Sequence, residues 1–135
     1  MSAIFSRAVR EFLDEPGHFA VVATVDLDGS PHQSVVWYQR QDDAVLVNAR
    51  EGRRWAANAR RAGSISIAIA AAYDYVILRG KAEIVDEPER AQDDIRSLAR
   101  RYGDDEEQFV GQRRVSFRLH PSHVAVHGRL AVHEE

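Results

Sequence analysis

Residues 47–63 read VNAREGRRWAANARRAG: the end of an apolar strand, a basic turn, and a short helix rich in alanine and arginine. Gly63 is a natural stop for this helix, because glycine adopts the left-handed conformation that often follows a helix C-terminus. The first N–H groups of a helix lack partners, and arginine adds forked donors and positive charge. The segment therefore predicts a cradle for an anion such as phosphate. A solvated basic helix face is the alternative interpretation.

The whole chain has 135 residues, a formal net charge of −3 and no cysteine. This length predicts a single domain, residues 1–135, around one core. The negative charge argues against broad nucleic-acid binding, so the arginines of residues 50–61 would act locally on a small molecule. The lack of cysteine excludes a disulfide framework, a thiolate zinc site and a cysteine nucleophile. It also fits a reducing compartment, so we expect a cytoplasmic protein. No run approaches the ~20 apolar residues of a membrane helix, so we expect no membrane partner.

Apolar runs separated by turn residues predict six strands. They cover residues 19–25, 31–40, 44–47, 64–70, 73–85 and 115–126. The first run is almost entirely apolar, which predicts burial of both its faces. Apolar residues at helical spacing predict two further helices, one over residues 4–13 and one over residues 87–102. Gly80 indicates a bulge or a close approach of another backbone. Together these elements predict a small, mainly antiparallel β-barrel with peripheral helices.

Four histidines crowd the C-terminal part of the chain: His120, His123, His127 and His133. A metal site needs three or four ligands that converge with fixed geometry. The first two flank Pro121 and the other two lie on an extended or frayed tail, so we interpret all four as solvated and predict no metal.

Other common catalytic patterns are missing from the sequence. Ser34, Ser64 and Ser66 do not lie in a Gly-x-Ser-x-Gly turn, and no order of Asp and His supports a triad. Neither a Rossmann fingerprint nor a Walker loop occurs. Trp37, Tyr38 and Trp55 flank the cradle in sequence, and aromatic faces beside a phosphate pocket suit a flat heteroaromatic ligand. Burial in the core or in a subunit interface is the alternative for Trp37.

Several ordered segments together resemble the pyridoxamine 5′-phosphate oxidase-like split-barrel family. They are residues 19–25, 28–32, 36–38, 53–58, 64–67, 76–85 and 113–115. The resemblance extends from about Phe12 to Gly128 and is greatest to the actinobacterial branch that uses the deazaflavin coenzyme F420. It implies a homodimer of six-stranded split β-barrels with two cofactor sites at the subunit interface.

The resemblance also implies which residues bind the cofactor. Those that would run beside the ring system are Gln33, Ser34, Val35, Val36 and Trp37. Asn48 and Arg50 would lie at the strand end, while Arg53, Arg54 and Asn58 would hold the phosphate and the ribityl chain.

Trp55 departs from the family's pattern, because much of the family has a lysine or arginine immediately after the basic pair. One phosphate partner is therefore missing. Arg50, Arg53 and Arg54 would compensate for it, or Trp55 would stack on the ligand, or binding would be weak. The cofactor choice depends on this, since members that use FMN and members that use F420 share the scaffold.

The activity implied by the resemblance is hydride transfer from reduced F420 to an unsaturated small-molecule acceptor. The alternatives are an FMN-binding oxidoreductase of the same fold and a non-catalytic flavin or deazaflavin carrier or sensor. In such enzymes the cofactor performs the redox step while the protein positions rings and excludes water, so no catalytic residue is predicted. Tyr38 and His32 are hypothetical proton donors to the reduced acceptor.

Overall fold

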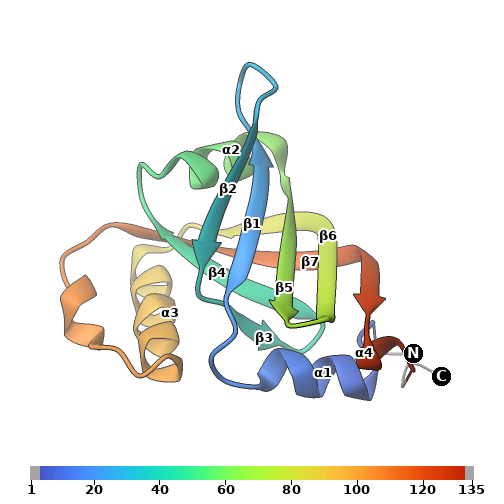
Figure 1. The fold of residues 1–135 in the computed structure, drawn as a ribbon. Helices are drawn as coiled ribbons and strands as arrows, with labels where there is room; N and C mark the ends of the chain where they lie inside the picture. The colour runs from blue at the N-terminus through green and yellow to red at the C-terminus, as the bar shows by residue number, and fades with distance from the viewer. Residues whose placement is uncertain (1–3, 133–135) are drawn as a thin grey trace.

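The computed structural model describes residues 4–132, which form one seven-stranded antiparallel sheet with helices around it (Figure 1). The strands are β1 (Ala20–Val25), β2 (Pro31–Val36), β3 (Gln39–Gln41), β4 (Ala44–Arg50), β5 (Ser64–Ala71), β6 (Asp74–Val85) and β7 (Arg114–His127). The helices are α1 (Arg7–Asp14), α2 (Arg54–Ala62), α3 (Pro88–Arg101), the 3-10 helix η1 (Glu106–Phe109) and α4 (Arg129–Val132). No helix within the described residues is long and apolar enough to span a bilayer.

The predicted mainly β fold with an antiparallel sheet and peripheral helices is confirmed, but the sheet has seven strands instead of six. The predicted strand over residues 31–40 breaks at Trp37 and Tyr38 into β2 and β3. The Tyr38 backbone N–H donates to the Tyr102 hydroxyl (3.2 Å), and the Tyr38 hydroxyl donates to the Leu13 carbonyl oxygen (2.8 Å). These bonds draw the residue out of the strand ladder and into the core.

This break also closes the sheet. The strand order is β2-β1-β5-β6-β7-β4-β3, so β2 and β3 form its two edges. They are nevertheless consecutive in the chain, and the three steps from Val36 to Gln39 span at most about 11 Å of extended backbone. The two edges must therefore lie near each other, and the sheet curls into an open barrel (Figure 1).

The core fills the inside of this curved sheet. Its fully buried side chains include Val22, Val47, Ile67, Leu78 and Phe117, one from each of five strands. The prediction that both faces of the first strand are buried is wrong, because a barrel strand alternates between inside and outside. Val21 and Ala23 face outward and are only half-buried.

The predicted basic segment forms the end of β4, a turn and α2. Gly63 ends the helix as predicted, with φ of 72° and its N–H donating to the Ala59 carbonyl oxygen at 2.8 Å. The helix buries Trp55 and Ala59 against the barrel and leaves most of its arginines toward solvent. The strand end and the helix start therefore meet at one corner of the barrel.

The close backbone approach predicted at Gly80 is also present. The β6–β7 register shifts between Arg79 and Gly80, and a Cβ atom at Gly80 would overlap the His120 carbonyl oxygen. Only glycine fits there without moving β7. The irregularity lets two long strands bend while they remain paired along most of their length.

Candidate functional site

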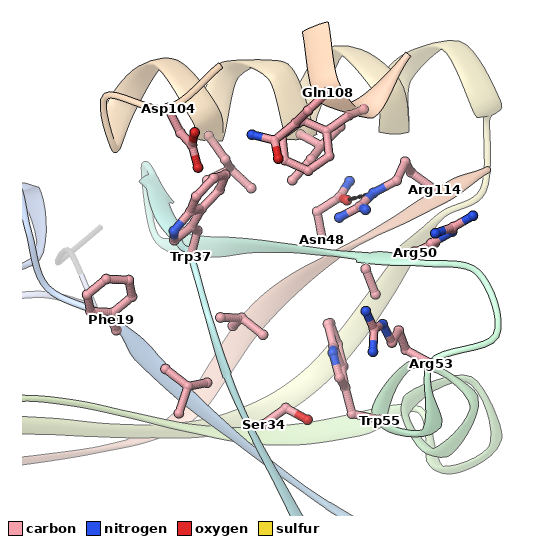
Figure 2. A pocket seen from close by; sticks show the side chains of 16 residues that line it. Phe19, Ser34, Trp37, Asn48, Arg50, Arg53, Trp55, Asp104, Gln108 and Arg114 are labelled. Carbon is pink, nitrogen blue, oxygen red and sulfur yellow. Dashed lines mark hydrogen bonds between the residues drawn. The ribbon is translucent and has the colours of Figure 1, made fainter. Parts of the chain in front are cut away.

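A pocket of about 540 Å³ lies where β2, the end of β4, the start of α2 and the start of β7 meet α3 and the segment after it (Figure 2). This volume is within the range of small-molecule sites, about 300–1,000 Å³. Figure 2 shows Arg50, Arg53 and Arg114 at one end, and Phe19 and Trp37 at the other. The pocket therefore has a basic end and an aromatic end.

Three secondary-structure boundaries supply the basic end. Arg50 ends β4, Arg53 is the residue before α2, and Arg114 begins β7. Antiparallel pairing places Arg50 opposite Arg114, an arrangement of like charges that destabilises a sheet. Within residues 4–132, no carboxylate forms an ion pair with any of the three. An anion bound here would therefore relieve repulsion that the fold leaves uncompensated.

Arg114 shows this cost most clearly. Burial, and then the charges of Arg50 and Arg53, lower the pKa of Arg114 to about 10. Its Nε donates to Asn48 Oδ1 at 2.9 Å and its Nη1 donates to Gln112 Oε1 at 2.8 Å. Both acceptors are neutral, so they orient the guanidinium without cancelling its charge.

Stacked rings form the aromatic end. Trp37 stacks on Tyr102, with ring centroids 5.2 Å apart and planes 12° apart. Phe109 meets Trp37 edge-on at 6.0 Å and 81°. Phe19, which is 51% exposed, packs at 5.5 Å from the Tyr102 ring. Such a wall offers a flat apolar surface to a planar ligand.

The structure brings eight of the eleven predicted site residues to this pocket: Ser34, Val35, Val36, Trp37, Asn48, Arg50, Arg53 and Trp55. They lie on or next to β2, β4 and the start of α2, three elements that the sequence predicted in the right order. Their roles toward a cofactor stay a prediction, whereas their convergence on one cavity is a feature of the fold.

Gln33, Arg54 and Asn58 do not line the pocket. The Arg54 side chain is 68% exposed and faces Asp26 at 3.8 Å. Asn58 is buried, and its Nδ2 donates to Thr24 Oγ1 (3.1 Å) and to Asp26 Oδ1 (2.9 Å). The Asn58 amide therefore anchors α2 to the end of β1 and is not available to a ligand. Gln33 is exposed on β2, one residue before the lining begins.

Trp55, the departure from the family's pattern, is a core residue at the edge of the pocket. It is 4% exposed and its ring packs on Phe117 with centroids 5.4 Å apart. The third guanidinium of the basic end comes from Arg114 on β7, not from α2. No role was predicted for Arg114, whose only signal was the Arg-Arg pair just before the predicted strand over residues 115–126, within a segment that resembles the family.

Other lining residues also lay outside the prediction. They come mainly from α3 and the segment after it, and include Ile95, Leu98, Asp104, Gln108 and Phe109. The apolar stripe of α3 did not indicate that Ile95 and Leu98 face a pocket as well as the sheet. The acidic run at residues 104–107 leads from α3 into η1, and it was not predicted as part of a site.

The two hypothetical proton donors differ in position. Tyr38 is fully buried, donates its proton to the Leu13 carbonyl oxygen and does not line the pocket. Burial raises the pKa of Tyr38 to about 12, with a smaller contribution from Tyr102. The hypothesis is therefore wrong for Tyr38. His32 Nε2 lies 3.4 Å from the hydroxyl of Ser34, which does line the pocket.

The histidines near the C-terminus are engaged separately. His120 Nε2 lies 2.6 Å from Glu83 Oε1, and the His127 ring stacks on Tyr75 with centroids 4.7 Å apart. Across residues 4–132, no group of three histidine, aspartate or glutamate side chains is arranged to hold a metal ion. His133 lies outside the described residues.

Comparisons with solved structures show the same fold in other proteins. An F420 reductase is 20% identical, with a TM-score of 0.72 over 93% of this chain and 98% of that one. The conserved hypothetical protein Rv2991 from Mycobacterium tuberculosis is 24% identical, with a TM-score of 0.77 over 96% and 89%. General Stress Protein 26 from Bacillus anthracis is 14% identical, with a TM-score of 0.67 over 89% and 91%.

The sequence itself decides the family. No curated protein matches the chain at a significant level. The family described as pyridoxamine 5′-phosphate oxidase, however, matches residues 5–128, which is nearly the whole chain and includes every part of the pocket. The chain therefore belongs to the pyridoxamine 5′-phosphate oxidase family.

Proposed function

We propose that the protein is an oxidoreductase that binds coenzyme F420 and reduces an unsaturated small-molecule acceptor. Its family is one of flavin-related oxidoreductases, and a solved structure with the same fold is an F420 reductase. The observation that carries the proposal is one pocket with three arginines at one end and stacked aromatic rings at the other. None of these arginines forms an ion pair with a carboxylate of residues 4–132.

The residues present fit a phosphate-bearing flavin or deazaflavin. Arg50, Arg53 and Arg114 would bind the phosphate, because guanidinium groups form strong charge-assisted hydrogen bonds with phosphate oxygens. The strand β2 from Ser34 to Val36 would run beside the ring system, with Trp37 closing the far end. Asn58 and Arg54 have no part in this arrangement. Of the three residues that the resemblance implied for the phosphate and the ribityl chain, only Arg53 is kept.

When bound, the cofactor would supply the hydride chemistry, and the chain's own residues would bind, orient and shield it. The arginines fix the phosphate end, so the ring position along β2 is set from that anchor. Phe19, Trp37 and Phe109 keep water from the aromatic end. His32, through the Ser34 hydroxyl at the pocket edge, would pass a proton to the reduced acceptor.

The proposed assembly is a homodimer in which the second copy covers the open side of the pocket. Apolar side chains along β1, the turn after it and β2 are exposed: Val25 by 54%, Leu27 by 86% and Val35 by 69%. Val35 also lines the pocket, so burying this surface would complete the site. Light scattering should give the mass of two chains, and a monomer at micromolar concentration would contradict this assembly.

A comparative titration tests the cofactor. We expect calorimetry to show tight binding of F420 and weaker binding of FMN. Riboflavin, which is FMN without its phosphate, should bind at least tenfold more weakly than FMN. The difference follows from losing charge-assisted bonds of about 1.5–3 kcal/mol each. Reduced F420 should then be oxidised faster with quinone or enone acceptors when the protein is present.

Each other outcome of these assays selects a different function. Tight binding of FMN alone would make the protein an FMN-dependent oxidoreductase. Tight binding of F420 without faster oxidation for any acceptor would make it a carrier or sensor. Failure to bind either cofactor would overturn the proposal.

A further inference from the structure

Asn48 belongs to a buried hydrogen-bonded chain that connects the pocket to α3. Its Nδ2 donates to the Ala91 carbonyl oxygen (2.9 Å) and to Ser116 Oγ (2.8 Å). The Ser116 hydroxyl, which is fully buried, donates to Asp94 Oδ2 at 2.8 Å. At the pocket end, Asn48 Oδ1 accepts from Arg114 Nε at 2.9 Å, as Figure 2 shows.

The partners fix the direction of each of these bonds. The Ser116 hydroxyl donates to Asp94 Oδ2, and the Ala91 carbonyl oxygen, which can only accept, receives one hydrogen bond from the Asn48 amide. The Ser116 oxygen then accepts the hydrogen bond from the other N–H of the Asn48 amide. The Asn48 oxygen must therefore face Arg114, because a flipped amide would set donors against donors at the guanidinium.

Arg114 keeps donors for a ligand in this arrangement. Of the five N–H groups of its guanidinium, one on Nε and one on Nη1 have protein acceptors among the described residues. Those acceptors, Asn48 Oδ1 and Gln112 Oε1, are neutral. Along this hydrogen-bonded chain, the carboxylate of Asp94 is separated from the guanidinium by the Asn48 amide and the Ser116 hydroxyl.

We propose that Asn48 is a positioning residue that aims Arg114 at the pocket and, because it is an amide, leaves the arginine's charge for the ligand. A carboxylate in its place would accept the same Nε–H bond but would neutralise the guanidinium. The proposal rests on the proposed function only in taking the ligand to be an anion. It gives Asn48 a role that its position at the strand end alone does not.

The substitution Asn48→Asp tests the charge-sparing part, because it adds a negative charge with almost no change of shape, while it also removes the two bonds donated by Asn48 Nδ2. With FMN as the probe, we expect at least tenfold weaker binding than wild type at pH 8. Binding should recover toward the wild-type value as the pH falls and the introduced carboxyl group takes up a proton. A ratio of the two affinities that stays flat between pH 5 and pH 9 would overturn this part, since the introduced charge would then have no effect on the ligand.

Gln41→Glu is the matched control. It makes the same change from amide to carboxylate at a half-buried position of β3, outside the pocket lining. We expect the FMN affinity of this variant to follow the wild-type affinity across the same pH range. An equal loss in both variants would attribute the effect to net charge and would also count against the proposal.

A ligand-free measurement separates this inference from the proposed function. The Arg114 Nε proton should exchange slowly with solvent in a nitrogen-resolved NMR spectrum, because it is held by a buried acceptor. We expect Asn48→Leu to speed its exchange at least tenfold, and the milder Ser116→Ala to speed it severalfold. Unchanged exchange in the folded variants would overturn the positioning role even if FMN and F420 both bind. Accelerated exchange with no binding of either would leave the positioning intact and remove the proposed function.

Discussion

Arg114 and Arg60 lie in opposite electrostatic surroundings within one small protein. Arg60 donates to Asp86 (3.0 Å) and to Glu51 (2.9 Å), and these two carboxylates raise its pKa. Arg114 donates to two neutral side-chain oxygens, and burial with neighbouring arginines lowers its pKa to about 10. A guanidinium between carboxylates stabilises the fold, whereas one kept away from them is available to an anion.

The same contrast divides the basic segment that dominates the sequence. The sequence does not distinguish its arginines from one another. In the structure, Arg60 and Arg54 face carboxylates, whereas Arg50 and Arg53 face the pocket. A cluster of arginines in the sequence therefore indicates where an anion could bind. Whether each arginine can bind the anion depends on whether a carboxylate of the protein already pairs with it.

The largest expected effect is on the pocket side of this comparison. Replacing Arg53 and Arg114 together by alanine should weaken FMN binding by about 3–6 kcal/mol, since each removes charge-assisted bonds to the phosphate. Calorimetry with FMN and riboflavin measures it. Arg54→Ala is the control. It should weaken FMN binding by less than about 0.5 kcal/mol, because Arg54 forms an exposed ion pair with Asp26 and does not line the pocket. An equal loss of riboflavin affinity in the double variant would place the phosphate elsewhere.

Arg60→Ala tests the arginine that is paired with carboxylates. It should lower the free energy of unfolding by about 1 kcal/mol, because the two partly exposed ion pairs with Glu51 and Asp86 are lost. FMN affinity should not change, since Arg60 does not line the pocket. Urea unfolding and the same titration measure both quantities. A tenfold loss of affinity without loss of stability would reverse the roles assigned to the two arginines.

The sign of the stability change sharpens the comparison further. In the ligand-free protein, Arg114→Gln should raise the free energy of unfolding by about 0.5 kcal/mol, because it removes a cross-strand pair of like charges with Arg50. Arg60→Gln should lower it. Thermal unfolding of both variants under one set of conditions provides the test, and destabilisation of both variants would contradict the sign expected for Arg114.

The smallest effect concerns acid. The hydrogen bond and charge of Arg60 hold the pKa of Asp86 below its usual value. A carboxyl group whose pKa is lower in the folded state stabilises the fold above its unfolded pKa, and this contribution is lost as the pH falls through its folded pKa. Asp86→Asn should therefore reduce the drop in melting temperature between pH 7 and pH 3. Asp93→Asn, on the exposed face of α3, is the control, and equal changes in both variants would contradict the expectation.

Most of the fold could be predicted from local patterns. The strands and helices fall close to the predicted ranges because apolar periodicity and turn residues act over a few neighbouring positions. The division of residues 31–40 could not be predicted in this way. It depends on Tyr38 bonding to Tyr102 and to Leu13, residues that are distant in sequence and meet only in the folded chain.

The site shows the same boundary between local and distant information. Arg50 and Arg53 were recognisable because they share one segment with the start of α2. Arg114 joins them only through the pairing of β4 with β7, and sequence spacing does not give that register. Asn48 and Asn58 were predicted alike, yet one supports an arginine of the pocket and the other ties α2 to β1.

The two tryptophans of the chain, Trp37 and Trp55, both line the pocket. The intrinsic ultraviolet emission of the protein therefore arises almost entirely at the site. A bound flavin or deazaflavin absorbs where tryptophan emits, so it would quench both indoles by resonance energy transfer. Trp37→Phe would leave a single reporter at the phosphate end. The protein thus contains its own optical probe, and occupancy can be followed in real time without a label.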